Sequence, residues 1–237
     1  MRICDSRTPA LLAAIGFALF ANGPASAGGA YLYEMADPAG VKYGSAGQAA
    51  RAGDAATVFT NPAGMTRFED SELLAGGTLV YLHAPFQPDE DNTVIGSDGQ
   101  TNEFLAGGQF AYARPISDKL SLGVSVHNYF GLMLDWSDQW VGRFNAVNVK
   151  MLAPQVQPTV AYKVNDWLSI GGGAGLTLGY LYDKTRVDTL DPDRGDGKLR
   201  VSDADFAIQG NLGILIEPSA RTRFGLRYLT ETDLDFE

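Results

Sequence analysis

Two histidines and two acidic clusters are the residues of this chain whose types could support catalysis or metal binding. His127 follows Ser125 by two positions, which would place both side chains on one face of a β-strand, where a base could activate a serine nucleophile. A hydrolase also needs an orienting Asn or Asp within hydrogen-bond reach of the histidine. Because the neighbouring residues of the same parity are small or polar, a polar strand face accounts for His127, and the sequence predicts no enzyme.

The acidic clusters Asp89–Asp91 and Asp191–Gly197 lack the spacing and the final glutamate of an EF-hand calcium loop, so solvated loops are the expected reading. The single cysteine, Cys4, and the two histidines form no metal-ligand pattern. No phosphate-binding loop is present either. We therefore expect no metal and no cofactor. With a net charge of −10 and no basic cluster, nucleic acid is not an expected partner.

The N-terminus has the three parts of a secretory signal. Arg2 and Arg7 open the chain, residues 10–21 form an apolar run too short to span a bilayer, and Ala25-Ser26-Ala27 supplies small residues for cleavage. The sequence predicts a signal peptide over 1–27, with a buried core helix as the alternative.

Alternation of apolar with small or polar residues dominates the rest of the chain. Leu120, Leu122, Val124 and Val126 alternate with Ser121, Gly123, Ser125 and His127. Similar alternation predicts seven strands of about ten or more residues, the length that crosses a bilayer, two of them weaker and near 73–83 and 104–114.

The connections between these strands alternate in length. Short turns such as "KVNDWL" alternate with long polar stretches at 84–103, 131–146 and 184–203, and aromatic residues gather near strand ends. This is the pattern of an all-β fold, a transmembrane antiparallel up-and-down β-barrel. A secreted β-sandwich is the alternative.

Residues 28–70 have no strand period and are rich in Gly and Ala. Asn61-Pro62-Ala63 lies near the end of this stretch. Proline disfavours helical backbone at Asn61, so no regular helix or strand is expected to pass there. A plain turn is one interpretation of the motif. The other is a hatch over 28–70 that packs inside a barrel over 71–237, because irregular backbone at membrane depth is tolerated where protein buries it.

The stretch "GAYLYEMADPAGVKYGSAGQAARAGDAATVFTNPAGM" resembles the hatch of the FadL-type outer-membrane transporters of long-chain fatty acids and aromatic hydrocarbons, whose hatch ends at Asn-Pro-Ala. "NYFGLMLDW", "YKVNDWLSIGGGAGL" and "FGLRYLTETDLDF" resemble later parts of that family.

The resemblance implies passive uptake of hydrophobic compounds through a plugged barrel in the outer membrane of a Gram-negative bacterium. Substrate would leave laterally where a strand is kinked. Implied partners are these hydrophobic ligands, outer-membrane lipids and the barrel-assembly machinery. We expect Asn61, Pro62 and Ala63 to close the hatch, and Tyr31, Leu32 and Phe59 to line an apolar pocket. A structural or adhesive outer-membrane protein, or a plain polar porin, is the alternative.

The chain departs from the family pattern in length. Seven predicted strands are half of the fourteen that the resemblance implies. We therefore expect a truncated or partial gene product, with a self-associating half-barrel as the alternative.

Overall fold

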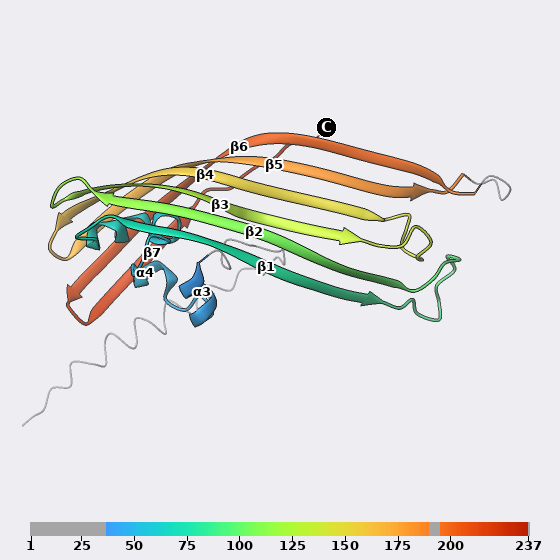
Figure 1. The fold of residues 1–237 in the computed structure, drawn as a ribbon, viewed down its shortest axis with the longest axis horizontal. Coiled ribbons are helices and arrows are strands. Elements are labelled where there is room, and N and C mark those ends of the chain that lie inside the picture. The colour runs from blue at the N-terminus through green and yellow to red at the C-terminus, as the bar shows by residue number, and fades with distance from the viewer. Residues whose placement is uncertain (1–36, 190–194, 237) are drawn as a thin grey trace, which may run out of the picture.

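The computed structural model describes residues 37–189 and 195–236. The predicted signal peptide, Tyr31 and Leu32 lie outside these residues. The described chain forms one antiparallel sheet of seven strands in sequence order (Figure 1). The strands are β1 (Glu72–Phe86), β2 (Gly99–Pro115), β3 (Leu120–Asp135), β4 (Asn148–Asn165), β5 (Leu168–Val187), β6 (Gly197–Ser219) and β7 (Thr222–Leu229). The predicted up-and-down order and all seven strands are confirmed.

The turns at one end of the sheet are short, as predicted, and cover residues 116–119, 166–167 and 220–221. Asn165 stabilises one of them, since its Oδ1 accepts hydrogen bonds from the N–H groups of Trp167 (3.0 Å) and Leu168 (2.9 Å). The loops at the other end, 87–98, 136–147 and 188–196, are shorter than predicted. The difference arises because polar residues at the strand ends stay within the ladder; Lys184 still pairs with Arg200.

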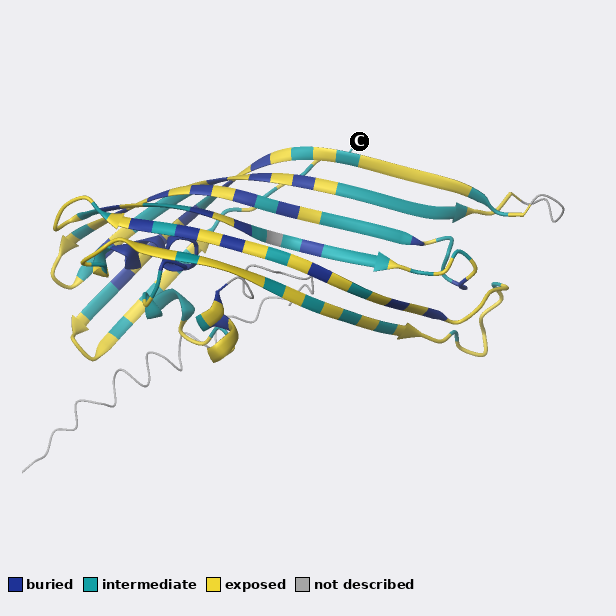
Figure 2. Ribbon diagram, in the orientation of Figure 1, coloured by how far each residue is buried: buried dark blue, intermediate teal, exposed yellow. Residues whose placement is uncertain are grey.

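The two faces of the sheet differ in chemistry. The outer face exposes large apolar side chains, with exposed fractions from 38% to 74% for Leu122, Val156, Val160, Ile170, Leu176, Phe206, Ile208 and Ile214. The inner face carries small and polar residues, many of them buried, such as Ala111, Ser125, Gln157 and Asn211. Figure 2 shows this alternation of buried and exposed positions along β2 to β5.

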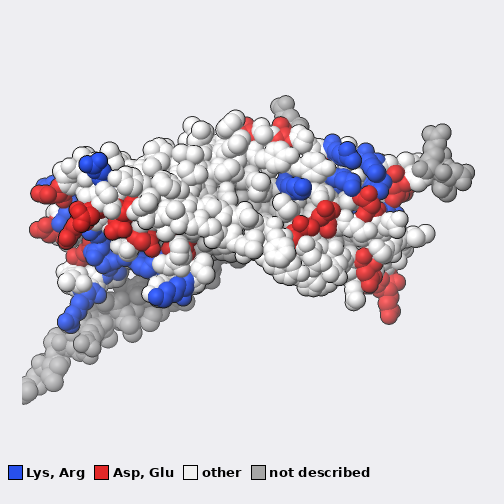
Figure 3. Space-filling view, in the orientation of Figure 1, with Lys and Arg blue, Asp and Glu red and all other residues white. Residues whose placement is uncertain are grey.

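Charged residues gather at the two ends of the sheet, and a broad uncharged band lies between them (Figure 3). Along β5, Ile170 and Tyr180 mark this band on the outer face, and their separation of ten residues corresponds to about 33 Å of strand. At the tilt usual for membrane barrels this covers about 25 Å of bilayer. Within the described residues, no helix combines the length and apolar character needed to span a membrane.

Residues 37–67, called here the N-terminal helical segment, pack against the inner face. The segment contains α3 (Pro38–Tyr43), α4 (Gln48–Arg51), α5 (Thr57–Thr60) and the 3₁₀ helix η1 (Pro62–Arg67). Asp37 caps α3, because its Oδ1 accepts the N–H of Ala39 at 2.9 Å, and its other oxygen pairs with Arg51. η1 contacts β4, β5 and β6, whereas α4 contacts β7.

Candidate functional site: the helical segment on the inner face

Glycines on the strands make room for the N-terminal helical segment. A β-carbon on Gly171 of β5 would lie 2.5 Å from the backbone nitrogen of Ala63, and one on Gly123 of β3 would lie 2.7 Å from Met65 Sδ. Gly213 and Gly225 face Asn61 and the backbone of Ala49 at still closer range. Real β-carbons do not approach other atoms this closely, so the segment can lie here only because these strand positions have no side chain.

Asn61 lies between α5 and η1, where it ends one short helix and caps the next. Its backbone is extended, with φ −160° and ψ 99°, which agrees with the effect of Pro62 on the residue before it. Our expectation that no regular helix passes this point holds at Asn61 alone, because η1 begins directly at Pro62. Proline is tolerated in the first helical position, since its missing N–H would have no intrahelical partner there.

The Asn61 side chain joins three parts of the structure. Its Oδ1 accepts the N–H of Ala63 at 3.2 Å, and its Nδ2 donates to the carbonyls of Ala49 and of Ile214 in β6, the latter at 3.1 Å. Asn61 is 1% exposed and Ala63 is fully buried. The side chain therefore ties the segment to the sheet as well as to itself.

Polar side chains of the inner face donate to backbone carbonyls of the segment. Gln157 Nε2 donates to Val58 O and Asn211 Nδ2 to Phe59 O, both at 3.0 Å. These carbonyls belong to α5, a helix of four residues whose C=O groups have few partners within the helix. The inner face thus gives hydrogen-bond donors to buried carbonyl groups whose burial without a partner would destabilise the fold. Sequence reasoning missed Gln157 and Asn211, although their inward parity was visible.

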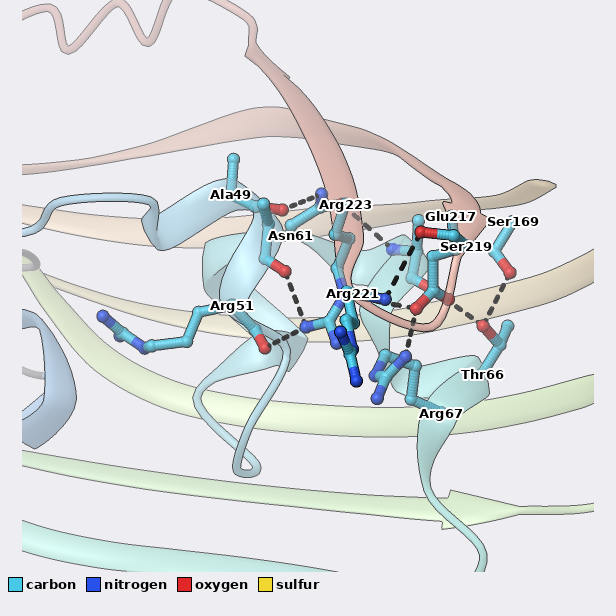
Figure 4. A network of polar contacts seen from close by, with 12 residues as sticks. Ala49, Arg51, Asn61, Thr66, Arg67, Ser169, Glu217, Ser219, Arg221 and Arg223 are labelled. Atoms are coloured by element: carbon cyan, nitrogen blue, oxygen red, sulfur yellow. Dashed lines mark hydrogen bonds and ion pairs between the residues drawn. The ribbon is translucent and has the colours of Figure 1, made fainter. Parts of the chain in front are cut away.

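Arg223 of β7 holds α4 in the same way. Its Nη1 donates to the carbonyls of Ala50 (2.9 Å) and Arg51 (2.6 Å), and its Nε bonds Glu217 at 3.2 Å. Glu217 also pairs with Arg67 of η1, and Figure 4 shows these groups side by side. One arginine–glutamate pair therefore connects α4 and η1 to the strand ends beside the turn between β6 and β7.

A hollow of about 790 Å³ lies between η1 and the short turns. Thr66 and Arg67 line it from the segment, and Ser117, Lys119 and Asp166 line it from the turns. Thr66 Oγ1 donates to Ser169 Oγ at 2.7 Å on its wall (Figure 4). The polar lining fits water better than a hydrophobic ligand.

Phe59, which we expected to line an apolar pocket, is fully buried. Its ring stacks on that of His127, with centroids 4.7 Å apart and an interplanar angle of 23°. His127 Nδ1 lies 3.4 Å from Ser125 Oγ, which is the weak limit of a hydrogen bond. Because Phe59 covers the imidazole, His127 serves in packing between the segment and β3, and a ligand can reach Phe59 only if this packing opens.

The ladder between β2 and β3 is interrupted. Residues of the two strands are paired from Pro115 opposite Ser121 to Phe110 opposite Val126. In the part of the chain that the structure describes, the pairing extends no further. Beyond it β2 continues to pair with β1, and β3, after a register shift between Asn128 and Phe130, continues to pair with β4. Residues 102–109 and 127–134 therefore face each other without a ladder, called here the β2–β3 gap.

Two loops close the gap at its far end. The N–H of Ser97 donates to Gln139 O (2.9 Å), and Ser97 O accepts from Val141 N (3.0 Å). Trp140 stacks on Trp136, with centroids 4.4 Å apart, and meets Phe86 edge-on at 5.6 Å. Residues 95–97 with 139–143 are called here the loop clasp.

An antiparallel up-and-down sheet with an apolar outer face and a polar inner face is a half-barrel of outer-membrane type, and sequence comparison agrees. Residues 18–237 match the family of outer membrane protein transport proteins (OMPP1/FadL/TodX), and the chain belongs to that family. Its relatives are outer-membrane proteins of Gram-negative bacteria, and this is where the chain is located.

Among its relatives, outer membrane protein P1 of Haemophilus influenzae is 27% identical over 264 residues, covering 92% of this chain and 56% of that protein. The long-chain fatty acid transport protein of Escherichia coli K12 is 23% identical, covering 81% and 49%. The chain spans about half the length of these relatives.

Solved structures show the same fold. A Pseudomonas aeruginosa FadL homologue superposes with a TM-score of 0.56 at 18% identity, covering 76% of this chain and 48% of its own. The toluene transporter TodX of Pseudomonas putida gives 0.59 at 14% identity, covering 74% and 51%.

Proposed function

We propose that the N-terminal helical segment is the hatch of a transporter that passes long-chain fatty acids or related hydrocarbons across the outer membrane by passive diffusion. The observation that supports this most is the close approach of Ala63, Asn61 and Ala49 to strand glycines. Such contact buries the inner face and leaves little room for water. An open polar porin would instead keep its inner face wet, which the burial of Gln157 and Asn211 argues against.

The driving force for uptake needs no coupled reaction. A fatty acid gains about 0.8 kcal/mol for each CH₂ group removed from water, so an apolar path can draw it from solution. We place the pocket for the chain beside the hatch, with Tyr31, Leu32 and Phe59 as its residues, and its opening would require Phe59 to leave His127. The names of the relatives describe transport, and no catalytic step is proposed here.

The β2–β3 gap supports a lateral exit. A hydrophobic compound that reached the inner face near Asn128 could pass between the two strands into the bilayer, because no ladder of hydrogen bonds has to break there. The loop clasp would keep the far end of the gap closed while the middle opens.

The test replaces Asn61 by Leu together with Pro62 by Gly in the reconstituted protein. This change removes the two hydrogen bonds that Asn61 Nδ2 donates and frees the backbone at position 62, so the hatch should loosen. Ion leak through planar bilayers should rise and fatty-acid uptake should change, while the barrel still assembles. Asn165→Leu is the matched control, because Asn165 caps a turn away from the segment.

Wild-type conductance and wild-type uptake in the double variant would show that Asn61-Pro62-Ala63 is only a turn. An equal rise in leak for Asn165→Leu would mean that general loosening, not the hatch, controls conductance.

A further inference from the structure

Cationic side chains gather on the outer face of β4, β5 and β6 near their loop ends. They are Lys150, Lys184, Arg186, Lys198 and Arg200. Lys184 pairs across the ladder with Arg200, and Arg186 with Lys198, while Lys150 lies opposite Tyr182. Figure 3 shows Lys and Arg gathered at this end of the molecule.

The cluster follows directly after the apolar band of the outer face. On β5 the order along this face is Leu176, Leu178, Tyr180, Tyr182 and then Lys184. Tyrosines of this kind mark the interface between hydrocarbon and headgroups in membrane barrels. Each step of two residues adds about 7 Å along the strand, so the cations lie at the depth of the lipid headgroups on the loop side. Long-loop ends of such barrels face outside the cell.

A groove of about 320 Å³ lies within the cluster. Lys150, Lys184 and Arg200 line it, together with Tyr180 and Tyr182, and Asp135 and Asn148 complete its wall. The Lys150 ammonium lies over the Tyr182 ring at 5.9 Å from its centroid. The groove thus offers cations beside aromatic rings, a combination suited to a charged headgroup above an acyl chain.

The carboxylate that lines the groove does not balance its cations. Asp138 accepts from Lys184 Nζ (2.7 Å) and from Arg186 Nη2 (2.8 Å), and Asp135 lies exposed on the groove wall. Three cations, Lys150, Lys184 and Arg200, therefore line the groove with one carboxylate, Asp135. Lys150 and Arg200 have no ion pair among the described residues, and both line the groove.

We propose that this groove binds the phosphate groups of a phosphorylated glycolipid in the outer leaflet, which would fix the barrel in its lipid surroundings. Guanidinium and ammonium groups are the usual partners of phosphate oxygens. The site uses β4, β5 and β6, each of which has a neighbouring strand on both sides, so both of its walls are present in this chain. It does not depend on transport or on the hatch.

The experiment measures retention of bisphosphorylated lipid A by the purified protein in a neutral detergent, using native mass spectrometry. Dephosphorylated lipid A and phosphatidylcholine serve as comparison lipids. The test variant is Lys150→Gln with Arg200→Gln. The control is Lys163→Gln with Arg221→Gln, which removes the same charge at the turn end of the sheet. Far-ultraviolet circular dichroism checks that each variant keeps its strands.

Wild type and control should retain bisphosphorylated lipid A about tenfold more tightly than the dephosphorylated form, as expected for two charge-assisted contacts. The test variant should lose this preference. If it does not fold, Lys150→Gln alone should reduce the preference by about threefold. Equal retention of both lipids by wild type, an equal loss in the control, or displacement of lipid A by inorganic phosphate alone would overturn the proposal.

Discussion

Gly171 of β5 lies directly against the backbone of Ala63. A methyl group on Gly171 would come within 2.5 Å of Ala63 N and 2.6 Å of the Pro62 carbonyl carbon. Backbone atoms cannot move aside as a flexible side chain can. This contact is therefore the most direct way to alter how the N-terminal helical segment lies on the sheet without changing the segment itself.

Gly171→Ala should displace the segment from the inner face at a cost of about 1–3 kcal/mol, the range for overpacked interiors. The measurement is maleimide labelling of a cysteine placed at the buried Thr60, in a chain whose Cys4 has been replaced. Labelling should be faster than in the parent chain. Gly77→Ala is the control, since a β-carbon there meets its nearest atom at 3.5 Å. Equal labelling in both variants would contradict the contact.

Docking of the segment should depend on pH through Asp54. Burial raises the pKa of the Asp54 carboxyl above its ordinary value of 3.8, although the hydrogen bond from Ala56 N (2.9 Å) opposes the rise. A carboxyl whose pKa is raised on folding favours the folded state at low pH. That contribution is lost as the pH rises from 3.8 through the raised pKa.

Asp54→Asn removes this cost of ionisation and keeps an acceptor for Ala56 N. At neutral pH the Thr60 cysteine should therefore label more slowly in Asp54→Asn than in the parent. The labelling rates of the two chains should converge near pH 3. At neutral pH, each unit by which folding raises the pKa of Asp54 allows their ratio to reach up to about tenfold. A ratio that does not vary with pH would exclude Asp54 as the titrating group.

Trp140→Ala should open the loop clasp. Trp140 is 8% exposed, stacks on Trp136, and donates from Nε1 to Ala146 O at 2.8 Å. Replacing a buried tryptophan by alanine lowers the free energy of unfolding by about 3–5 kcal/mol. Because Trp140 packs between two loops, we expect the destabilisation in those loops. Residues 87–98 and 136–147 should become sensitive to protease, whereas the half-exposed Trp167→Ala should leave them resistant. Protection of both loops in Trp140→Ala would mean that backbone bonds alone hold the clasp.

A covalent link across the β2–β3 gap should block uptake if compounds leave there. A β-carbon on Gly107 would lie 3.4 Å from Asn128 Nδ2, so cysteines at these two positions can be joined by a short thiol cross-linker. Uptake should fall several-fold on cross-linking and recover with a cleavable reagent. A pair at Tyr112 and Val124, which are already ladder partners, should have no effect. Undiminished uptake through the linked gap would exclude lateral exit.

Strand number and order could be predicted from the sequence because a strand repeats every two residues and each apolar face is long enough to be seen in isolation. The ends of the strands could not. Lys184 and Arg200 look like loop residues by polarity, yet they pair with each other because hydrogen bonding of the backbone does not stop where the apolar band stops.

The contacts of the segment were beyond sequence reasoning for a different reason. Gln157 and Asn211 were visible as polar residues on an inner face, but their partners, Val58 O and Phe59 O, are backbone groups about 100 and 150 positions away. The segment is itself rich in Gly and Ala, but the positions whose missing side chains make room for it lie on the strands, at Gly171 and Gly213.

Where Gly171 and Gly225 meet backbone atoms, the fit cannot be adjusted by degrees. A side chain against a side chain offers a graded series of sizes, and a lineage can move through it one methylene at a time. A glycine that faces a peptide group allows no such series, because the next larger side chain, the methyl group of alanine, already collides with the backbone. Tightness at these two points is therefore a discrete property: relatives that pack their segment differently would be expected to differ in strand spacing or segment path, not in the bulk of the residues between them.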